Sequence, residues 1–280
     1  MTPTAPTASH PTQPYPNDTL RWVAAEVRYP RFNDFVGGFA SAFHDQMREH
    51  FPVYEEQTQM SVSVGPTGPS AQQLLQHRFI TRDRLMSVTM GRELFMLETT
   101  DYQGWATFRL LLIEALRALE QAQRPDGIVR VGLRYIDEIR LPDPPEDFAA
   151  WTGWVDERLV APFTLDDQAQ PAGGTVVLQY GEPPGYVTLF RAAPLAGGRT
   201  VQEEGPLRMP FSTADGPYFL FDTDASWEDP ERQVPEFAPD RIAETLDELH
   251  RTSKRLFEAS ITDRLRAEVL SRPREEVFGT

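Results

Sequence analysis

The segment VRVGLRYIDEIRL, residues 129–141, constrains the fold more than any other part of the chain. Side chains alternate between the two faces of a β-strand, so its odd-numbered positions share one face. Six of these seven positions are apolar or aromatic, and the seventh is Asp137. The pattern predicts a strand whose apolar face joins the core, with a carboxyl group on that face.

The carboxyl group of Asp137 needs an explanation, because an ionised carboxylate on a core face costs several kcal/mol unless it is paired or hydrogen-bonded. Three arrangements satisfy this requirement. Asp137 lies beyond the buried part of the strand, near the rim of the sheet; or it is buried and bonded to an arginine or a hydroxyl group; or it lines a pocket. An Asp137→Asn change is expected to be tolerated in the structural arrangements.

Other segments predict further strands and several helices. Alternating or apolar stretches indicate strands at residues 20–29, 57–64, 77–90, 93–100, 175–180, 185–193 and 217–225. Helical spacing of apolar residues and capping residues indicate helices at residues 33–52, 105–123, 146–160 and from 239 to about 270. Residues 65–70, 194–217 and 227–240 are expected to be loops. The predicted fold class is α+β, with antiparallel sheets packed against long amphipathic helices.

The order of the elements suggests two halves. LFMLETTDY (94–102) before the helix at 105 parallels YFLFDTDAS (218–226) before the helix at 240. One interpretation is a tandem duplication that forms a pseudo-dimer of two similar α+β units. The predicted organisation is a disordered tail rich in Pro and Thr, two halves and a C-terminal tail, at residues 1–18, 19–142, 143–272 and 273–280.

Composition excludes several functions. The net charge of −15 argues against direct contact with nucleic acid or with an anionic membrane surface. The chain has no cysteine, which excludes disulfides, Cys-ligated metals and thiol catalysis. No apolar run is long enough for a membrane span, and the first residues do not resemble a secretory signal. A cytoplasmic location is therefore expected.

The candidate site residues come from the central strand and the last helix. Arg134, Tyr135, Asp137 and His250 are proposed to line a ligand-binding pocket between the two halves. Arg130, Arg134 and Arg140 share the opposite strand face, where they either bind an anion or pair with some of the 42 acidic residues.

Metal and cofactor signals are weak. Asp222 and Asp224 are spaced as two carboxylates at a strand end, but without further ligands at a readable spacing. Nucleophile elbows, phosphate-binding loops and dinucleotide fingerprints are absent from the sequence, so no cofactor, no metal and no catalytic residue are predicted.

Several stretches together resemble a known family. They are NDTLRWVAAEVRYPRF, ETTDYQGWATF, VGLRYIDEIRLP, FLFDTDA and ELHRTSKRLFEASITDRLR. The chain is similar, from about residue 17 to 268, to a sporadically distributed family of bacterial proteins of similar length that is labelled conserved hypothetical. Asp137 stands where the family is expected to have Asn more often. The family has no established activity to transfer, and its scattered distribution suggests conditional roles, defence among them.

Three functional hypotheses remain. The first is a non-catalytic intracellular interaction protein, regulatory or defence-associated, whose partner is another protein. The alternative is a small-molecule-binding module, or an unrecognised enzyme, with a pocket between the two halves. The third is a self-assembling protein in which the long final helix supplies a homodimer face.

Overall fold

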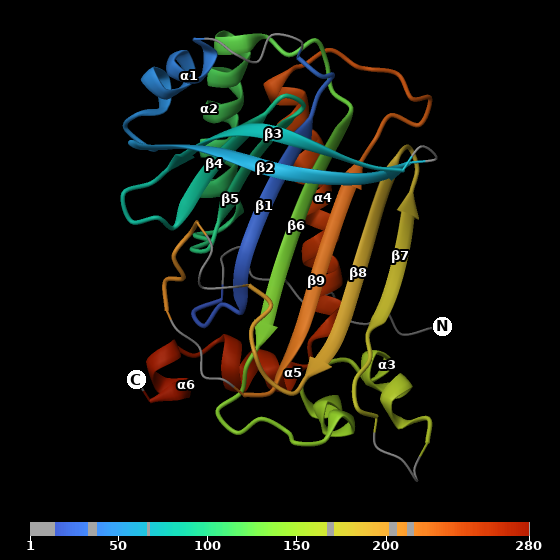
Figure 1. Cartoon of the computed structure of the whole chain (residues 1–280). Coiled ribbons are helices and arrows are strands. Elements are labelled where there is room, and N and C mark those ends of the chain that lie inside the picture. The colour runs from blue at the N-terminus through green and yellow to red at the C-terminus, as the bar shows by residue number, and fades with distance from the viewer. Residues whose placement is uncertain are drawn as a thin grey trace, which may run out of the picture.

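The computed structural model describes residues 15–32, 38–65, 68–166, 171–201, 206–211 and 216–279, and residues 59–74 by their backbone alone. Its centre is one nine-stranded antiparallel sheet with the order β2-β3-β4-β5-β1-β6-β9-β8-β7 (Figure 1). The strands are β1 (Leu20–Arg28), β2 (Val53–Gly65), β3 (Gly68–Ile80), β4 (Met86–Gly91), β5 (Leu94–Thr99), β6 (Arg130–Ile139), β7 (Val176–Glu182), β8 (Tyr186–Leu195) and β9 (Tyr218–Trp227). The predicted α+β class is confirmed, with one continuous sheet in place of several.

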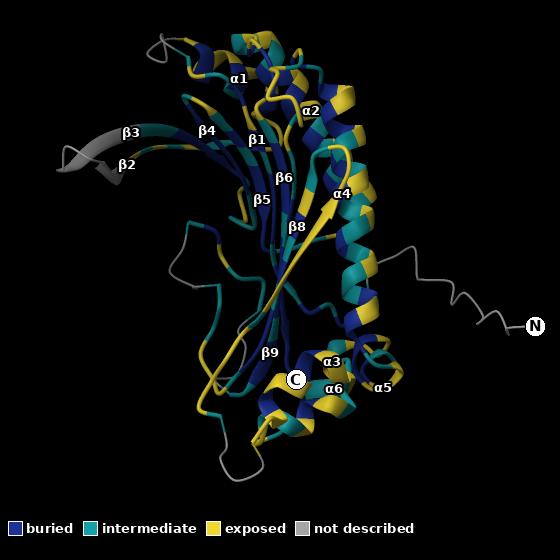
Figure 2. Ribbon diagram, turned by 90° about the vertical axis from the view of Figure 1, so that its right-hand side faces the viewer, coloured by how far each residue is buried: buried dark blue, intermediate teal, exposed yellow. Residues whose placement is uncertain are grey.

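The helices lie mainly on one face of this sheet (Figure 2). The α-helices are α1 (Phe39–Met47), α2 (Trp105–Gln123), α3 (Glu157–Val160), α4 (Pro239–Ser260), α5 (Asp263–Leu265) and α6 (Arg274–Phe278). Short 3-10 turns occupy Phe148–Gly153 and Ala161–Thr164, and a π-helical turn occupies Arg266–Leu270. In the described part of the chain, no helix is long and apolar enough to cross a membrane.

Alternation along the strands produces two separate hydrophobic clusters beneath the helices. The upper cluster joins residues of β1, β4, β5 and β6 to the buried sides of α1, α2 and α4. The lower cluster joins the far end of β6 to β8, β9 and the segments around α3 and α5. On β6, Tyr135 belongs to the upper cluster and Ile139 to the lower one, while Asp137 lies between them. The sheet face predicted from the odd positions of β6 is therefore the helix-covered face.

Several predicted boundaries are corrected by the structure. The segment 77–90 is not one strand, because a turn at Thr81–Arg84, in which Arg84 has φ of 60°, separates β3 from β4. Residues 57–64 and part of the expected loop at 65–70 belong to the β2–β3 hairpin. The helix expected at 146–160 is a 3-10 turn followed by α3.

The last long helix is shorter than expected. It ends at Ser260, because Ile261 is extended and forms a β-bridge with Val155. Thr262 then begins α5 by accepting a hydrogen bond from the backbone N–H of Leu265. The apolar side of α4 is covered by the sheet, so it is not available as the homodimer face that the sequence suggested.

The two predicted tails are partly structured. Residues 15–18, expected to be disordered, contact the rest of the protein: the Asn17 backbone N–H donates to the carbonyl of Leu270 at 3.1 Å. Residues 1–14, the remainder of that tail, lie outside the described residues, as do residues 33–37 at the start of the helix expected at 33–52. The predicted C-terminal tail contains α6.

The stability of the upper cluster provides a direct test of this packing. Leu246 of α4 is fully buried, whereas Leu110 of α2 is 70% exposed. Leu246→Ala is expected to lower the free energy of unfolding by about 2–5 kcal/mol, since it opens a cavity under α4. Leu110→Ala, the control, is expected to stay within about 0.5 kcal/mol of the wild type. Urea unfolding of both variants measures the difference, and equal effects would contradict the packing of α4.

Candidate functional site

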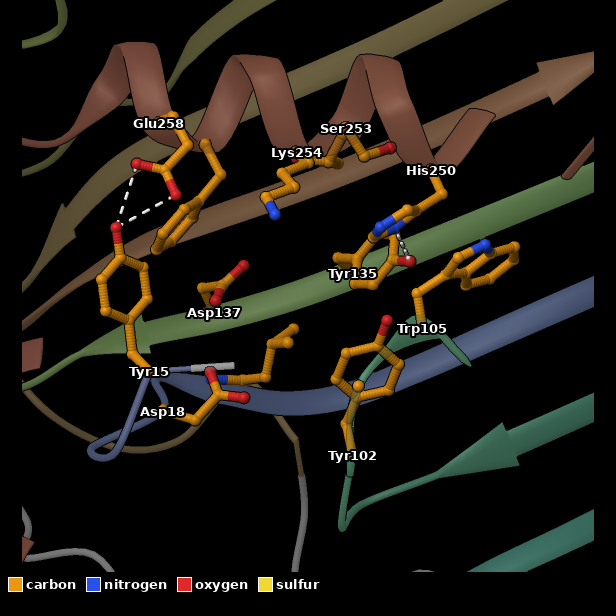
Figure 3. A pocket seen from close by; sticks show the side chains of 14 residues that line it. Tyr15, Asp18, Tyr102, Trp105, Tyr135, Asp137, His250, Ser253, Lys254 and Glu258 are labelled. Atoms are coloured by element: carbon orange, nitrogen blue, oxygen red, sulfur yellow. Dashed lines mark hydrogen bonds between the residues drawn. The ribbon is translucent and has the colours of Figure 1, made fainter. Parts of the chain in front are cut away.

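A pocket of about 120 Å³ lies between the two hydrophobic clusters, under the second half of α4 (Figure 3). Its floor is β6 and the start of β1, and its sides are α4, the segment that precedes α2, and residues 15–18. The lining residues are Tyr15, Asp18, Leu20, Tyr102, Gly104, Trp105, Tyr135, Asp137, Thr223, His250, Ser253, Lys254, Phe257 and Glu258. The pocket therefore occupies the place where the apolar face of the sheet is interrupted.

The buried side of α4 changes from apolar to polar residues at the pocket. Ile242, Leu246 and Leu249 face the upper cluster, Ser253 follows Leu249 by one turn, and His250 and Lys254 beside them also line the pocket. Leu246, Leu249 and Ser253 are three or four residues apart, and His250 and Lys254 are four apart, so the pocket residues continue the buried side of the helix. The polar part of this side lies opposite Asp137 on β6 (Figure 3). Two polar interruptions, one on a strand and one on a helix, thus meet in space.

Two carboxyl groups, those of Asp18 and Asp137, form the acidic wall. The hydroxyl of Thr19 donates a hydrogen bond of 2.9 Å to Oδ1 of Asp137, and the backbone N–H of Leu20 donates one of 3.0 Å to Oδ1 of Asp18. Burial raises the pKa of Asp137 to about 8, and repulsion from Asp18 adds to the rise. Burial likewise raises the pKa of Asp18 to about 6. Asp137 is therefore mainly protonated at neutral pH.

A β-bulge shapes the floor of the pocket. Leu20 pairs with Asp137 and Trp22 with Ile136, so Arg21 is an extra residue in β1. Without this insertion, Leu20 and Trp22 would share a face. With it, the side chain of Leu20 lines the pocket, while Arg21 interacts with Glu138 on the opposite face of the sheet.

Aromatic side chains form the opposite wall. The indole of Trp105 stacks on the imidazole of His250, with 4.6 Å between the ring centres and 10° between the planes. The hydroxyl of Tyr135 and Nδ1 of His250 share a hydrogen bond of 2.8 Å, and Tyr102 meets Tyr135 edge to face. The indole N–H of Trp105 donates to Asp247 at 2.7 Å, which fixes the ring.

His250 is held neutral in this wall. Burial lowers its pKa to about 4, and repulsion from Lys254 contributes. Burial also raises the pKa of Tyr135 well above its ordinary value, so its phenol stays protonated. The Tyr135–His250 pair is consequently an uncharged hydrogen-bonded unit at neutral pH, and the imidazole is too weak a base to remove a proton efficiently.

The third acid, Glu258, closes one end of the pocket and is fully paired. Tyr15 donates its hydroxyl hydrogen to the carboxylate, whose two oxygens both lie 3.0 Å from it. Arg266 forms an ion pair with the same carboxylate at 3.0 Å. These contacts hold residues 15–18 along one side of the pocket, next to α4. This contact explains why a segment predicted to be a free tail contributes two lining residues.

The residues proposed from the sequence are divided between two faces. Tyr135, Asp137 and His250 line the same pocket. Arg134 does not, because it is an even-numbered residue of β6 and points to the opposite side of the sheet. There its guanidinium donates two hydrogen bonds of 2.8 Å to Asp222. Arg134 was predicted to line the ligand site, and the structure places it on the other face of the sheet.

The weak metal candidates belong to that opposite face as well. Asp222 is bound by Arg134 and also by Arg191, at 2.9 Å, and Asp224 pairs with Arg130 at 3.4 Å. These carboxylates thus neutralise arginines. Among the described residues, no group of three or more His, Asp or Glu side chains could hold a metal ion.

Several lining residues were missed by sequence reasoning. Tyr102 and Trp105 lie at a junction that was noted for its family resemblance and as the start of a predicted helix, not as a binding site, and Asp18 lay in the predicted tail. The signal available for Lys254 was the polar interruption of the α4 stripe, which apolar spacing alone did not reveal. For Tyr15 no local signal exists, because its partner is 243 residues away in sequence.

Comparison with known proteins adds no functional assignment. No protein-family model matches the chain, and no curated protein is significantly similar to it in sequence. The geometry of the pocket and its chemistry are accordingly the basis for a functional proposal.

The raised pKa of Asp137 predicts a pH-dependent effect of its replacement. The unfolded residue loses its proton near pH 3.8 and the folded one only near pH 8, so the wild-type protein loses stability as the pH rises between these values. Asp137→Asn keeps an acceptor for Thr19 and removes this loss. Its stability relative to the wild type should rise with pH, by at most about 1.4 kcal/mol per pH unit.

Denaturant unfolding between pH 4 and 8 measures this effect. Asp240→Asn serves as the control, because the side chain of Asp240 is 75% exposed and its replacement should give a nearly flat profile. A loss of more than about 2 kcal/mol for Asp137→Asn at neutral pH would show instead that the charge itself is required.

Proposed function

We propose that the protein is a small-molecule-binding module whose ligand occupies the pocket between β6 and α4. The observation that carries this proposal is the pair of carboxyl groups, Asp18 and Asp137, enclosed within an aromatic-lined pocket without an ion-pair partner among the described residues. Aromatic walls with a few directed polar groups are the ordinary composition of ligand sites in proteins. Enclosed titratable groups with shifted pKa values are enriched at functional sites.

Binding is favoured over catalysis by how the polar groups are engaged. Ser253 donates its hydroxyl hydrogen to the carbonyl of Leu249 in its own helix. His250 is bonded to Tyr135, and its lowered pKa makes it a poor base. Among the described pocket residues, no serine or threonine hydroxyl is therefore coupled to the imidazole, whose hydroxyl partner is the phenol of Tyr135. We retain a cytoplasmic location as part of the proposal.

The duplication suggested by the sequence remains part of this proposal. The strand order places β1 and β6 side by side, with the hairpins of the first half beyond β1 and those of the second half beyond β6. Each side also supplies one long helix, α2 or α4, at its end. A two-fold relation of this kind supports a pseudo-dimer, with the second unit beginning at β6 and not at residue 143, where the boundary between the halves was predicted from the sequence. The pocket would then lie at the junction of the two units.

A second candidate function, protein interaction, is favoured by the edge strand β7. Val177, Leu178 and Tyr180 are 55%, 37% and 40% exposed, and Val187 of β8 beside them is 38% exposed. Glu182 is the one charged residue of β7. Edge strands are usually protected by charges, proline or bulges, so an exposed apolar edge indicates a pairing surface.

We propose that the partner at this edge is a second copy of the chain. Antiparallel pairing of two β7 strands centred on Gln179 would place Leu178 opposite Tyr180 of the other copy, twice per interface. Aromatic and aliphatic cross-strand pairs of this kind stabilise sheets. Such a two-fold contact is closed, which is the usual symmetry of soluble dimers.

The pocket is tested with a chemically mixed fragment library that contains cations, anions and neutral compounds. Ligand-observed NMR should find fragments that bind the wild-type protein and are lost in Ser253→Phe, because the larger side chain fills the pocket. Arg134→Ala, on the opposite face, should retain every such fragment. Circular dichroism checks that both variants fold. The proposal would be refuted if every fragment still bound to the Ser253→Phe variant, or if no fragment bound to the wild-type protein.

The dimer is tested by sedimentation at micromolar concentration. The wild type should have twice the monomer mass of 31.8 kDa, and Leu178→Lys with Tyr180→Lys should have the monomer mass. The double variant is expected to be monomeric because, in each cross-strand pair, two lysine ammonium groups would face each other across the interface. Leu110→Lys, an exposed apolar position on α2, is the control and should stay dimeric. A monomeric wild type, or a monomeric Leu110→Lys variant, would contradict pairing through β7.

A further inference from the structure

Three acids, Asp18, Asp137 and Glu258, line the pocket together with one cation, Lys254. Glu258 is neutralised by Arg266 and hydrogen-bonded to Tyr15. Asp18 and Asp137, in contrast, receive hydrogen bonds from Leu20 and Thr19 but form no ion pair with any described residue, Lys254 included. The pocket thus encloses two acids that compete with each other for ionisation.

An enclosed acid without a cationic partner lowers the stability of the protein. A bound positive charge would compensate for this loss of stability, because it would allow both carboxyl groups to ionise and would offset their mutual repulsion. A neutral ligand would leave the cost unchanged, and an anionic ligand would increase it. The acidic wall therefore selects for a positively charged ligand.

The aromatic wall decides which kind of cation fits. The rings of Tyr15, Tyr102, Tyr135 and Phe257 line the pocket together with the Trp105–His250 stack. Ring faces attract weakly hydrated organic cations, by about 0.5–2 kcal/mol each. A metal ion would need several oxygen ligands in place of these rings, and the described residues offer no such cluster. The neutral state of His250 adds no positive charge to the same wall.

We infer that the natural ligand is a small organic cation, an amine or a quaternary ammonium compound, whose charged head lies against Asp18 and Asp137. Its carbon atoms pack on the aromatic rings. This inference rests on the proposed binding function and names the chemical class of its ligand.

The test uses two cations, each paired with a neutral compound of nearly the same shape. Choline is compared with 3,3-dimethyl-1-butanol, and benzylamine with benzyl alcohol. Isothermal titration or ligand-observed NMR on the full chain at neutral pH should show that at least one cation binds at least tenfold more tightly than its neutral partner. Asp18→Asn and Asp137→Asn should each weaken binding of that cation about tenfold. Both variants should leave the affinity for the neutral compound unchanged.

The control for the loss of one negative charge is Asp240→Asn, at the exposed start of α4, which should bind the cation as the wild type does. Equal affinity for cations and their neutral partners, or cation binding that both asparagine variants retain, would overturn the inference. If neutral or anionic fragments still bind and are lost in Ser253→Phe, the proposed binding function stands and the cation assignment alone fails. If no compound of any charge binds, both fail.

Discussion

The antiparallel pairing of β1 with β6 is the interaction on which the rest of the structure depends. It is the one contact between neighbouring strands that joins the β2–β5 side of the sheet to the β7–β9 side. Its register places Val23 opposite Tyr135 and Ala25 opposite Leu133, so apolar residues of both strands support the upper cluster. A shift of one residue would turn these side chains to the opposite face. The ladder also ends at the pocket, where the bulge at Arg21 places Leu20 and Asp137 side by side.

The pocket exists because the two clusters do not merge. Along β6 the helix-facing side chains run from Tyr135 through Asp137 to Ile139, and along α4 from Leu249 through His250 and Ser253 to Phe257. A leucine at Asp137 and at Ser253 would allow the apolar contacts to continue without a break. The chain instead keeps polar groups at the middle of its core, at a cost in stability that increases with pH. Such costs are typical of sites where function, and not packing, determines the residues.

The sequence predicted elements with strong local patterns. The alternation in β6 identified the covered face and the unusual position of Asp137, and helical spacing identified α2. It could not predict the end of α4, because the bridge between Ile261 and Val155 is a tertiary contact. The β2 strand was underestimated for a similar reason: its polar residues carry little apolar alternation, and its length is fixed by pairing with β3.

The site was predictable in part for the same physical reason. Tyr135, Asp137 and His250 were identified because each departs from, or borders, a clear apolar stripe. Arg134 was included by its proximity in sequence, although alternation places it on the other face, where Asp222 binds it. Tyr15 and Asp18 could not be predicted as site residues. Nothing in the local sequence of a proline-rich segment indicates the distant carbonyl and carboxylate groups that hold it in place. Long-range hydrogen bonds of this kind are invisible to local patterns.

The attachment of residues 15–18 has a consequence for when the pocket acquires its complete lining. The amide of Asn17 donates to the carbonyl of Val269, 252 positions later in the chain, at 3.2 Å. During synthesis, the first strand and the segment before it leave the ribosome long before the residues that hold them. The wall formed by Tyr15 and Asp18 therefore depends on contacts with residues at the end of α4 and in the turns that follow it, which are synthesised last. The pocket thus has its complete lining only when residues at the two ends of the described chain are packed together.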